Sequence, residues 1–160
     1  MDADAFDAYF TARYALLVGH VTAMWGDRDD AADAVQEAFV RAWTKRREFG
    51  RHPSKDAWIR TVARNLLIDG WRKRRRHVPL EFEPTAFGPD SDARVSLHRA
   101  LAELPTNQRD AIVLHYLADL PVAQVAAELG AEPGTVRVWL SRGRRGLGVL
   151  LEDDKEPRHA

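Results

Sequence analysis

The stretch SKDAWIRTVARNLLIDGWRKRRR, residues 54–76, is the part of the chain around which the rest is organised. At a helical period its apolar side chains gather on one side, at Trp58, Ile59, Val62, Ala63, Leu66 and Leu67. The opposite side carries Arg60, Thr61, Arg64, Asn65, Ile68, Trp71 and Arg72, and the helix then ends in an unbroken basic run, residues 72–76. An anchored helix with cations, amides and an exposed aromatic favours nucleic acid as a partner. The alternative at this point is a solvated helix with a basic tail.

The net charge of zero hides a strong segregation of charge. Residues 41–80 hold thirteen basic and three acidic side chains, and residues 132–151 hold four basic and one acidic. The remaining parts of the chain are acidic. Two separate basic blocks predict two contact points on a polyanion.

Two further helices are predicted ahead of residues 54–76. The first covers residues 4–25 and ends at Gly26, and the second runs from Asp29 to about residue 47, with Asp27 or Asp29 as its cap. The outward face of the second helix presents Asp33, Gln36, Glu37, Val40 and Thr44. Such a face is either solvated or a docking surface for a partner helix, and spacing alone leaves both open. Residues 49–53 are expected to form a loop, after which Ser54 caps the next helix.

The composition changes after the basic run. Residues 77–91 contain three prolines, a glycine and several acids and show neither a helical nor a strand period of apolar residues, so they are interpreted as a linker. The sequence therefore predicts an all-α protein of two small helical domains, at residues 1–76 and 92–151, with a disordered tail at residues 152–160.

The segment PVAQVAAELGAEPGTVRVWLSRGRR, residues 121–145, has the layout of a helix-turn-helix. Gly130 ends the first helix in a left-handed cap, and the second helix is expected to bury Val136, Leu140, Gly143 and Leu147. Its outer arc and flanks carry arginines and a valine, which can contact phosphates, guanine edges and thymine methyl groups. The alternative is an ordinary pair of helices in an all-α domain.

No motif for catalysis, metal binding or cofactor binding is present. The histidines lack ligand spacing, and no phosphate loop, nucleophile elbow or dinucleotide fingerprint occurs. There is no cysteine, no signal-peptide pattern, and no apolar run near the roughly 20 residues that cross a bilayer. We expect a cytoplasmic, soluble protein that is not an enzyme and that binds no metal or cofactor.

Two blocks of sequence resemble bacterial RNA polymerase sigma factors of the extracytoplasmic-function class, group IV of the sigma-70 family. Residues 33–43, DAVQEAFVRAW, and residues 57–69, AWIRTVARNLLID, look like sigma region 2 together with the basic run. Residues 102–109, AELPTNQR, and residues 134–136, GTV, resemble sigma region 4. The resemblance covers about residues 5–150, and the Ala- and Arg-rich character is similar to that of actinobacterial members.

This resemblance implies a factor that binds core RNA polymerase, directs it to promoters and helps to melt them. It places Asp33, Gln36, Glu37 and Val40 against the clamp of the largest polymerase subunit. It places Asn65 and Asp69 where the family receives a flipped base of the minus-ten element. The whole minus-ten set is Arg60, Arg64, Asn65, Asp69, Trp71, Arg72, Lys73, Arg74, Arg75 and Arg76. The minus-thirty-five set is Thr135, Arg137, Val138, Ser141, Arg142 and Arg145.

The resemblance also implies contact with the flap of the second-largest subunit, and it allows for an anti-sigma factor as a further partner. Ala34 departs from the family's usual leucine, and Gly70-Trp71 departs from its usual aromatic or histidine followed by leucine. The alternative function is a stand-alone helix-turn-helix regulator or a sigma-like antagonist. A regulator, however, has no reason to carry a polymerase-docking face beside a strand-melting helix.

Overall fold

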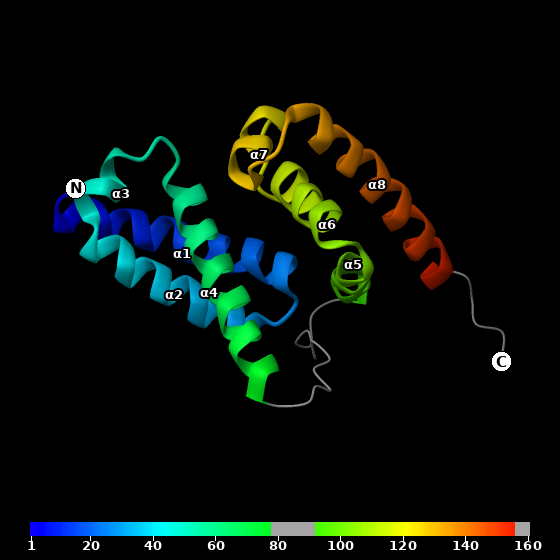
Figure 1. Ribbon diagram of the computed structural model, residues 1–160, viewed down its shortest axis with the longest axis horizontal. Helices are drawn as coiled ribbons and strands as arrows, with labels where there is room; N and C mark the ends of the chain where they lie inside the picture. The colour runs from blue at the N-terminus through cyan, green and yellow to red at the C-terminus, as the bar shows by residue number, and fades with distance from the viewer. Residues whose placement is uncertain (78–91, 156–160) are drawn as a thin grey trace. The chain divides into compact units, whose positions relative to one another are not determined.

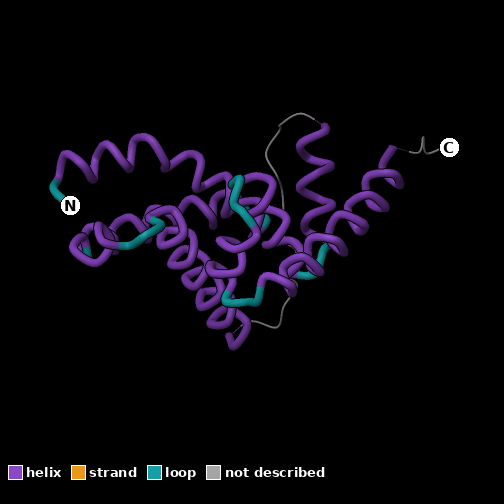
Figure 2. The backbone as a smooth tube through the Cα atoms, turned by 90° about the horizontal axis from the view of Figure 1, so that it is seen from above, coloured by secondary structure: helices purple, strands orange, loops and turns teal. Residues whose placement is uncertain are grey.

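A computed structural model describes residues 1–77 and 92–155, and every regular element within those ranges is a helix (Figure 1). Figure 2 shows the same ranges as helices joined by short loops. The chain divides into two compact units, the first containing α1 to α4 and the second containing α5 to α8. The predicted all-α class with two helical domains is confirmed.

The first unit contains the helices α1 (Ala3–Trp25), α2 (Arg28–Thr44), α3 (Arg46–Arg51) and α4 (Lys55–His77). Gly26 ends α1 with a φ of 109°, and the Asp27 side chain caps α2 by accepting from the Asp30 N–H at 2.8 Å. The Ser54 hydroxyl oxygen accepts from the Ala57 N–H at 3.2 Å, as its predicted capping role requires. The helix ends predicted at these residues are confirmed: Asp27 and Ser54 each accept from an amide that the start of a helix leaves unpaired, and the Gly26 N–H donates to the Thr22 carbonyl at the end of α1.

The second predicted helix is shorter than expected, and the predicted loop at residues 49–53 is partly wrong. The backbone leaves helical geometry at Lys45, and a new helix, α3, then includes Phe49. The Phe49 side chain is fully buried, with its ring centroid 6.1 Å from that of Phe6 and 5.2 Å from that of Trp58. Burial of this large ring stabilises an extra helical turn that the local sequence does not predict.

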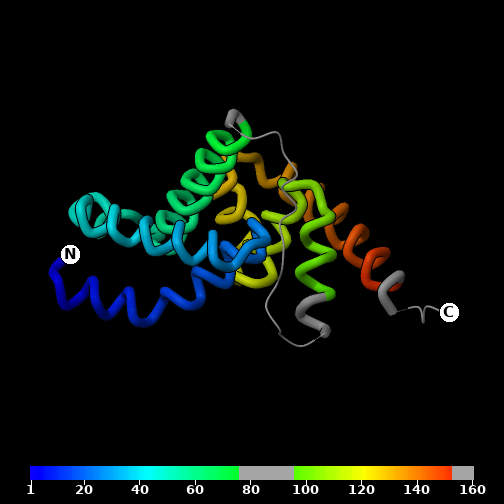
Figure 3. Tube along the Cα trace, turned by 90° about the horizontal axis from the view of Figure 1, so that it is seen from below, coloured from blue at the N-terminus to red at the C-terminus, as the bar shows by residue number. Residues whose placement is uncertain are grey.

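The core of the first unit lies between α1, α2 and α4. In the Cα trace α1 and α2 run alongside each other, and α4 packs against both (Figure 3). The buried residues of this core include Leu17, Val21, Ala31, Val35, Ala38, Phe39, Ala42, Ile59, Ala63 and Leu67. Alanines at the α2 contacts allow the neighbouring backbones to approach closely. One side of α4 is therefore buried against α1 and α2.

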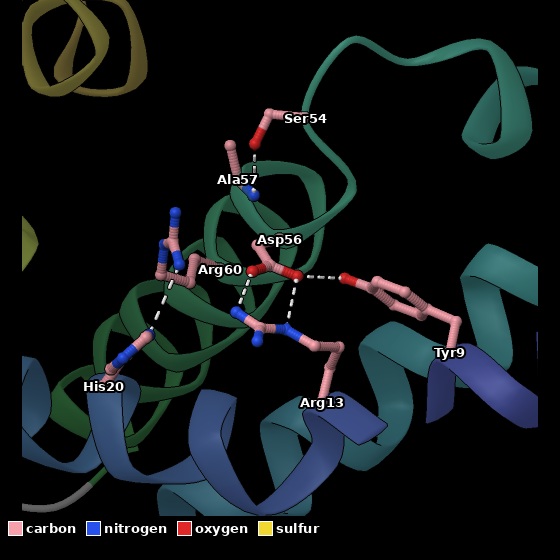
Figure 4. Close-up of polar contacts among 7 residues, drawn as sticks. All are labelled: Tyr9, Arg13, His20, Ser54, Asp56, Ala57 and Arg60. Carbon is pink, nitrogen blue, oxygen red and sulfur yellow. Dashed lines mark hydrogen bonds and ion pairs between the residues drawn. The ribbon is translucent and has the colours of Figure 1, made fainter. Parts of the chain in front are cut away.

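A polar cluster joins α1 to the beginning of α4 (Figure 4). Asp56 accepts a 2.6 Å hydrogen bond from the Tyr9 hydroxyl group and forms an ion pair with Arg13, whose Nε lies 3.3 Å from Oδ1. Burial raises the pKa of Asp56, but hydrogen bonds from Arg13 and Tyr9 outweigh burial, so the net pKa lies below its usual value. Burial, followed by the hydrogen bond to Asp56, raises the pKa of Tyr9. The cluster therefore favours an ionised Asp56 beside a neutral Tyr9.

The second unit contains α5 (Asp92–Glu103), α6 (Thr106–Ile112), the π-helix η1 (Val113–Leu117), α7 (Val122–Leu129) and α8 (Pro133–Lys155). Its buried apolar residues are Ala100, Leu101, Leu104, Ala111, Ile112, Val113, Leu114, Val125, Ala126, Val136 and Leu140. Gly130 follows α7 in the left-handed region with a φ of 65°, so the predicted glycine cap of the helix-turn-helix is confirmed.

Close approach of α8 to α6 depends on a glycine. A Cβ atom at Gly143 would lie 2.7 Å from Cγ1 of Ile112, which is inside van der Waals contact. At Gly148, in the same helix, no atom lies within 4 Å of the corresponding position. Only the first of these two glycines is required by packing.

The domain boundaries differ in detail from the prediction. His77 belongs to α4, and the other residues assigned to the linker, 78–91, lie outside the described residues. Helix α8 continues to Lys155, so residues 152–155 are helical where a disordered tail was expected, and residues 156–160 lie outside the described residues.

We predict that Asp56→Asn lowers the free energy of unfolding of the first unit by about 1–2 kcal/mol at pH 7, because charge-assisted hydrogen bonds are lost from a partly exposed pair. The folded-state pKa of Asp56 lies below that of the unfolded chain, so its contribution is complete above about pH 4 and is lost as the pH falls through the folded pKa. Urea unfolding at several pH values, followed by tryptophan fluorescence, measures this effect. Tyr9→Phe is the control that keeps the ion pair, and acid dependence in Asp56→Asn equal to wild type would contradict the assignment.

We predict opposite effects for two substitutions in α8. Gly143→Ala crowds Ile112 and is expected to cost about 1–3 kcal/mol, more than the helix gains from alanine. Gly148→Ala meets open space and is expected to stabilise by about 0.5–1 kcal/mol. Thermal unfolding followed by circular dichroism distinguishes the two, and equal shifts in the same direction would show that the approach of α6 is not limiting.

Candidate polymerase and nucleic-acid interfaces

The outward side of α2 forms one exposed strip, consisting of Asp33, Gln36, Glu37 and Val40. Their spacing places all four on one side of the helix, and the side chain of Val40 is 55% exposed although it is apolar. Glu37 pairs with Arg41 at 3.4 Å, but both side chains are about half exposed, so this pair contributes less than about 1 kcal/mol. The structure thus brings together all four residues predicted for polymerase docking, here called the α2 strip.

A shallow groove between α2 and α4 borders the α2 strip. It is lined by Asp30, Asp33, Ala34, Glu37, Leu66, Leu67, Gly70 and Arg74. Ala34 is buried, so its departure from the family's leucine affects the packing under the groove and not the α2 strip itself. Gly70, the other departure from the family pattern, lines the same groove.

The outward side of α4 carries Asn65 and Asp69, which are both exposed and lie one turn apart. Arg72, Lys73, Arg74 and Arg75 follow as exposed cations, and the side chain of Arg76 lies outside the described residues. The half-buried Trp71 ring has the guanidinium carbon of Arg75 4.9 Å from its centroid, a cation–π contact. Arg64 is half-buried on the flank.

The prediction that Arg60 belongs to the DNA-facing side is wrong. Arg60 is only 1% exposed, and its Nη1 lies 3.3 Å from Nδ1 of the buried His20 on α1 (Figure 4). The buried side of α4 is rotated from the predicted one, because Asp56 and Arg60 face α1 while Trp58 and Val62 are only partly buried. Arg60 was predicted to be exposed because of its charge, and nothing in the sequence indicates its partner His20, forty residues earlier.

The second helix of the helix-turn-helix, α8, exposes all of the residues predicted for the minus-thirty-five element: Thr135, Arg137, Val138, Ser141, Arg142 and Arg145. Val136, Leu140 and Gly143 are buried on the other side, as predicted, whereas Leu147, which was also expected to be buried, is only partly buried. Val138 is 45% exposed, so an apolar contact is available between the arginines. Arg144 differs from these arginines, because its Nη1 donates to the Tyr116 hydroxyl group at 3.0 Å.

The π-helix η1 exposes a surface that the sequence does not predict. The Ala118 N–H donates to the Val113 carbonyl, five residues back, at 3.0 Å, and Nδ1 of His115 lies 2.8 Å from the Leu120 carbonyl oxygen. This wider turn leaves Tyr116 48% and Leu117 38% exposed, whereas a regular α-helical period would direct Leu117 inward. A register shift of one residue has no signature in apolar spacing.

Within residues 1–77 and 92–155, no group of three or more histidine, aspartate or glutamate side chains is arranged to hold a metal ion. No helix in the same part of the chain combines the length and the apolarity that crossing a bilayer requires. The exposed charged sides of α2, α4 and α8 are therefore the features that point to a function.

Comparison with known proteins assigns the chain to a family. Models of sigma-70 region 2 and sigma-70 region 4 match residues 9–77 and 94–147. Over 158 residues the chain is 32% identical to the ECF RNA polymerase sigma factor SigL of Mycobacterium tuberculosis, an alignment that spans 91% of this chain and 88% of that protein. The chain belongs to the extracytoplasmic-function class of the sigma-70 family.

Solved structures of sigma factors share this fold. The sigma factor RpoE from Bartonella quintana, in complex with the anti-sigma factor NepR, superposes with a TM-score of 0.84 at 28% identity, covering 96% of this chain and 100% of that chain. CnrH, in complex with the cytosolic domain of CnrY, superposes with a TM-score of 0.73 at 25% identity, covering 96% and 92%. As a sigma factor, the chain directs RNA polymerase to promoters, which confirms the function predicted from the two sequence blocks.

Proposed function

We propose that this sigma factor docks on core RNA polymerase through the α2 strip, whose four residues contact the clamp of the largest subunit. The observation that supports this proposal is an exposed strip that combines two carboxylates, an amide and an uncovered valine on a helix whose other side is buried. A helix that buries one side and presents such a mixed face fits a partner helix with complementary charge.

We further propose that the outward side of α4 binds the unwound minus-ten element. Extruding a base costs a few kcal/mol of stacking, so amide and aromatic contacts at the receiving site must offset that energy. Asn65 and Asp69 supply hydrogen-bonding groups one turn apart, while Arg64, Trp71 and the exposed cations of residues 72–75 flank them. Arg60 has no part in this site because it is buried.

In the second unit, we propose that the exposed side of α8 enters the major groove at the minus-thirty-five element. Its arginines can contact guanine edges or phosphates, and Val138 offers an apolar contact to a thymine methyl group. Arg144 is left out of this set because it is bonded to Tyr116.

The complexes of RpoE with NepR and of CnrH with CnrY support an anti-sigma factor as a further partner of this chain. The flap of the second-largest polymerase subunit is the partner proposed for the second unit. The protein acts with the polymerase in the cytoplasm and contributes binding energy to initiation without catalysing a reaction itself.

Run-off transcription with core polymerase on a set of candidate promoters tests this function, and two variants separate its steps. Glu37→Lys reverses a charge on the α2 strip and is expected to weaken core binding at least tenfold, whereas Asp7→Lys, an exposed acid on α1, is the control with the same change in charge.

Asn65→Ala is expected to keep core binding and duplex binding but to lose about 1–3 kcal/mol of open-complex stability, measured by permanganate reactivity. Normal melting by Asn65→Ala, or unchanged core affinity of Glu37→Lys, would contradict the respective assignment.

For α8 we predict that Arg142→Ala weakens binding of duplex promoter DNA, while Arg144→Ala, also exposed on α8, does not. If Arg142 reads a base, the loss is about 1–3 kcal/mol and disappears on a promoter already altered at that base pair. If Arg142 contacts a phosphate, the slope of log K against log salt falls by about 0.9. Titration of the holoenzyme with labelled duplex at several salt concentrations distinguishes these results, and an unchanged affinity would remove Arg142 from the interface.

A further inference from the structure

An apolar side chain lies on the exposed side of α8, where packing within the unit does not account for it. Val138 is 45% exposed in the second turn of the helix, whereas Val136 and Leu140 are buried. A β-branched residue is slightly unfavourable in a helix, so helix formation does not account for this valine either. A contact with an apolar group outside the chain would account for it.

The surroundings of Val138 are cationic. Arg137 precedes it, Ser141 and Arg142 lie one turn further along the helix, and all three are exposed. Residues 133–151 include no acidic side chain. A surface of this charge attracts a polyanion, and the apolar group that the major groove of DNA presents is the C5 methyl group of a pyrimidine. Such a methyl group in duplex DNA fits both the charge and the valine.

The approach to Val138 is open. Side chains in an α-helix lean toward its N-terminus, so Val138 covers the turn that contains Gly134. Gly134 has no side chain, and a Cβ atom placed there would meet open space. Valine also has one strongly preferred rotamer in a helix, so its two methyl groups point in a fixed direction and lose little entropy on contact. A base edge can therefore reach these methyl groups without moving the protein.

We propose that Val138 is a specificity-determining residue, which reads the C5 methyl group of one pyrimidine, thymine or 5-methylcytosine, in the minus-thirty-five element. This inference rests on the proposed docking of α8 in the major groove. A base edge without the methyl group would place only polar groups against the valine, where they lose water without gaining a hydrogen bond. The valine thus selects for the methyl group and against its absence.

Ser141 explains why both methylated pyrimidines fit. It lies one turn after Val138 on the same exposed side of α8. Its hydroxyl group can donate to the O4 of thymine or accept from the N4 amino group of cytosine. The methyl group, which the two bases share, then decides the affinity. Methylation of a cytosine at this position would strengthen binding of the promoter.

The test uses holoenzyme and labelled duplexes derived from a promoter transcribed in the run-off screen. Two pairs of duplexes differ by one methyl group only: thymine against uracil, and 5-methylcytosine against cytosine. Each pair is placed in turn at every pyrimidine position of the minus-thirty-five element. At one position, the same for both pairs, the methyl group is expected to raise the affinity about fourfold, as one buried methyl group does.

Val138→Ala is expected to reduce this methyl effect to less than about twofold, because the two methyl groups of the valine are lost. Val149→Ala is the matched control. Val149 is 56% exposed on the same helix, about 16 Å further along its axis, so its removal is expected to leave the fourfold effect unchanged. The affinity for core polymerase is expected to be unchanged in both variants.

A methyl effect that persists in Val138→Ala, or no methyl effect at any position in wild type, would overturn the inference. An effect of thymine without one of 5-methylcytosine would overturn the shared reading of the methyl group, since O4 would then be required. Reduced core affinity in Val138→Ala would also overturn it, because the valine would then contact a protein.

Arg142→Ala on the same duplexes separates failure of this inference from failure of the proposed function. Weaker binding by Arg142→Ala without any methyl effect in wild type keeps α8 in the major groove and removes only the role of Val138. Unchanged binding by both Arg142→Ala and Val138→Ala removes the docking of α8 itself.

Discussion

The orientation of α4 about its own axis depends on the carboxylate of Asp56. Tyr9 and Arg13 of α1 both bond to this carboxylate, and one turn later Arg60 reaches His20 of the same helix. These contacts lie beside the apolar packing of Ile59, Ala63 and Leu67, so polar and apolar contacts hold the same side of α4 against its neighbours. Because directional hydrogen bonds tolerate little rotation, the side that remains exposed is determined as well. Asn65 and Arg72 lie on that exposed side.

Each helix that carries a proposed contact has one side buried in the core and the opposite side exposed. Helix α2 buries Val35, Ala38 and Phe39 and exposes the α2 strip, while α8 buries Val136 and Leu140 and exposes its arginines. The exposed surfaces differ in charge, since α2 presents carboxylates and both α4 and α8 present cations. A neutral chain can thus serve a protein partner and a polyanion at once, because the opposite charges are kept on different helices.

Much of the candidate site followed from the helical period. The residues predicted to face outward on α2 and α8 are all exposed, because both helices have a clear apolar side whose opposite faces away from the core. Arg60 was misplaced because an arginine was assumed to be solvated, although a buried polar partner can hold it inside. The exposed pair Tyr116 and Leu117 was missed because a π-turn shifts the register by one residue. Phe49 was assigned to a loop because its packing partners, Phe6 and Trp58, belong to other helices, so the local helical spacing around Phe49 does not reveal them.

By itself the sequence determined the all-helical class, the two units, the helix caps at Ser54 and Gly130, and the sigma-factor family. These properties depend on local chemistry and on ordered motifs, which a linear chain carries in full. Tertiary structure alone decided which of the charged residues on α4 are available and how closely α8 approaches α6 at Gly143. The physical reason is that each of these depends on contacts between segments far apart in sequence, where packing chooses among rotations that the helical period leaves nearly equivalent.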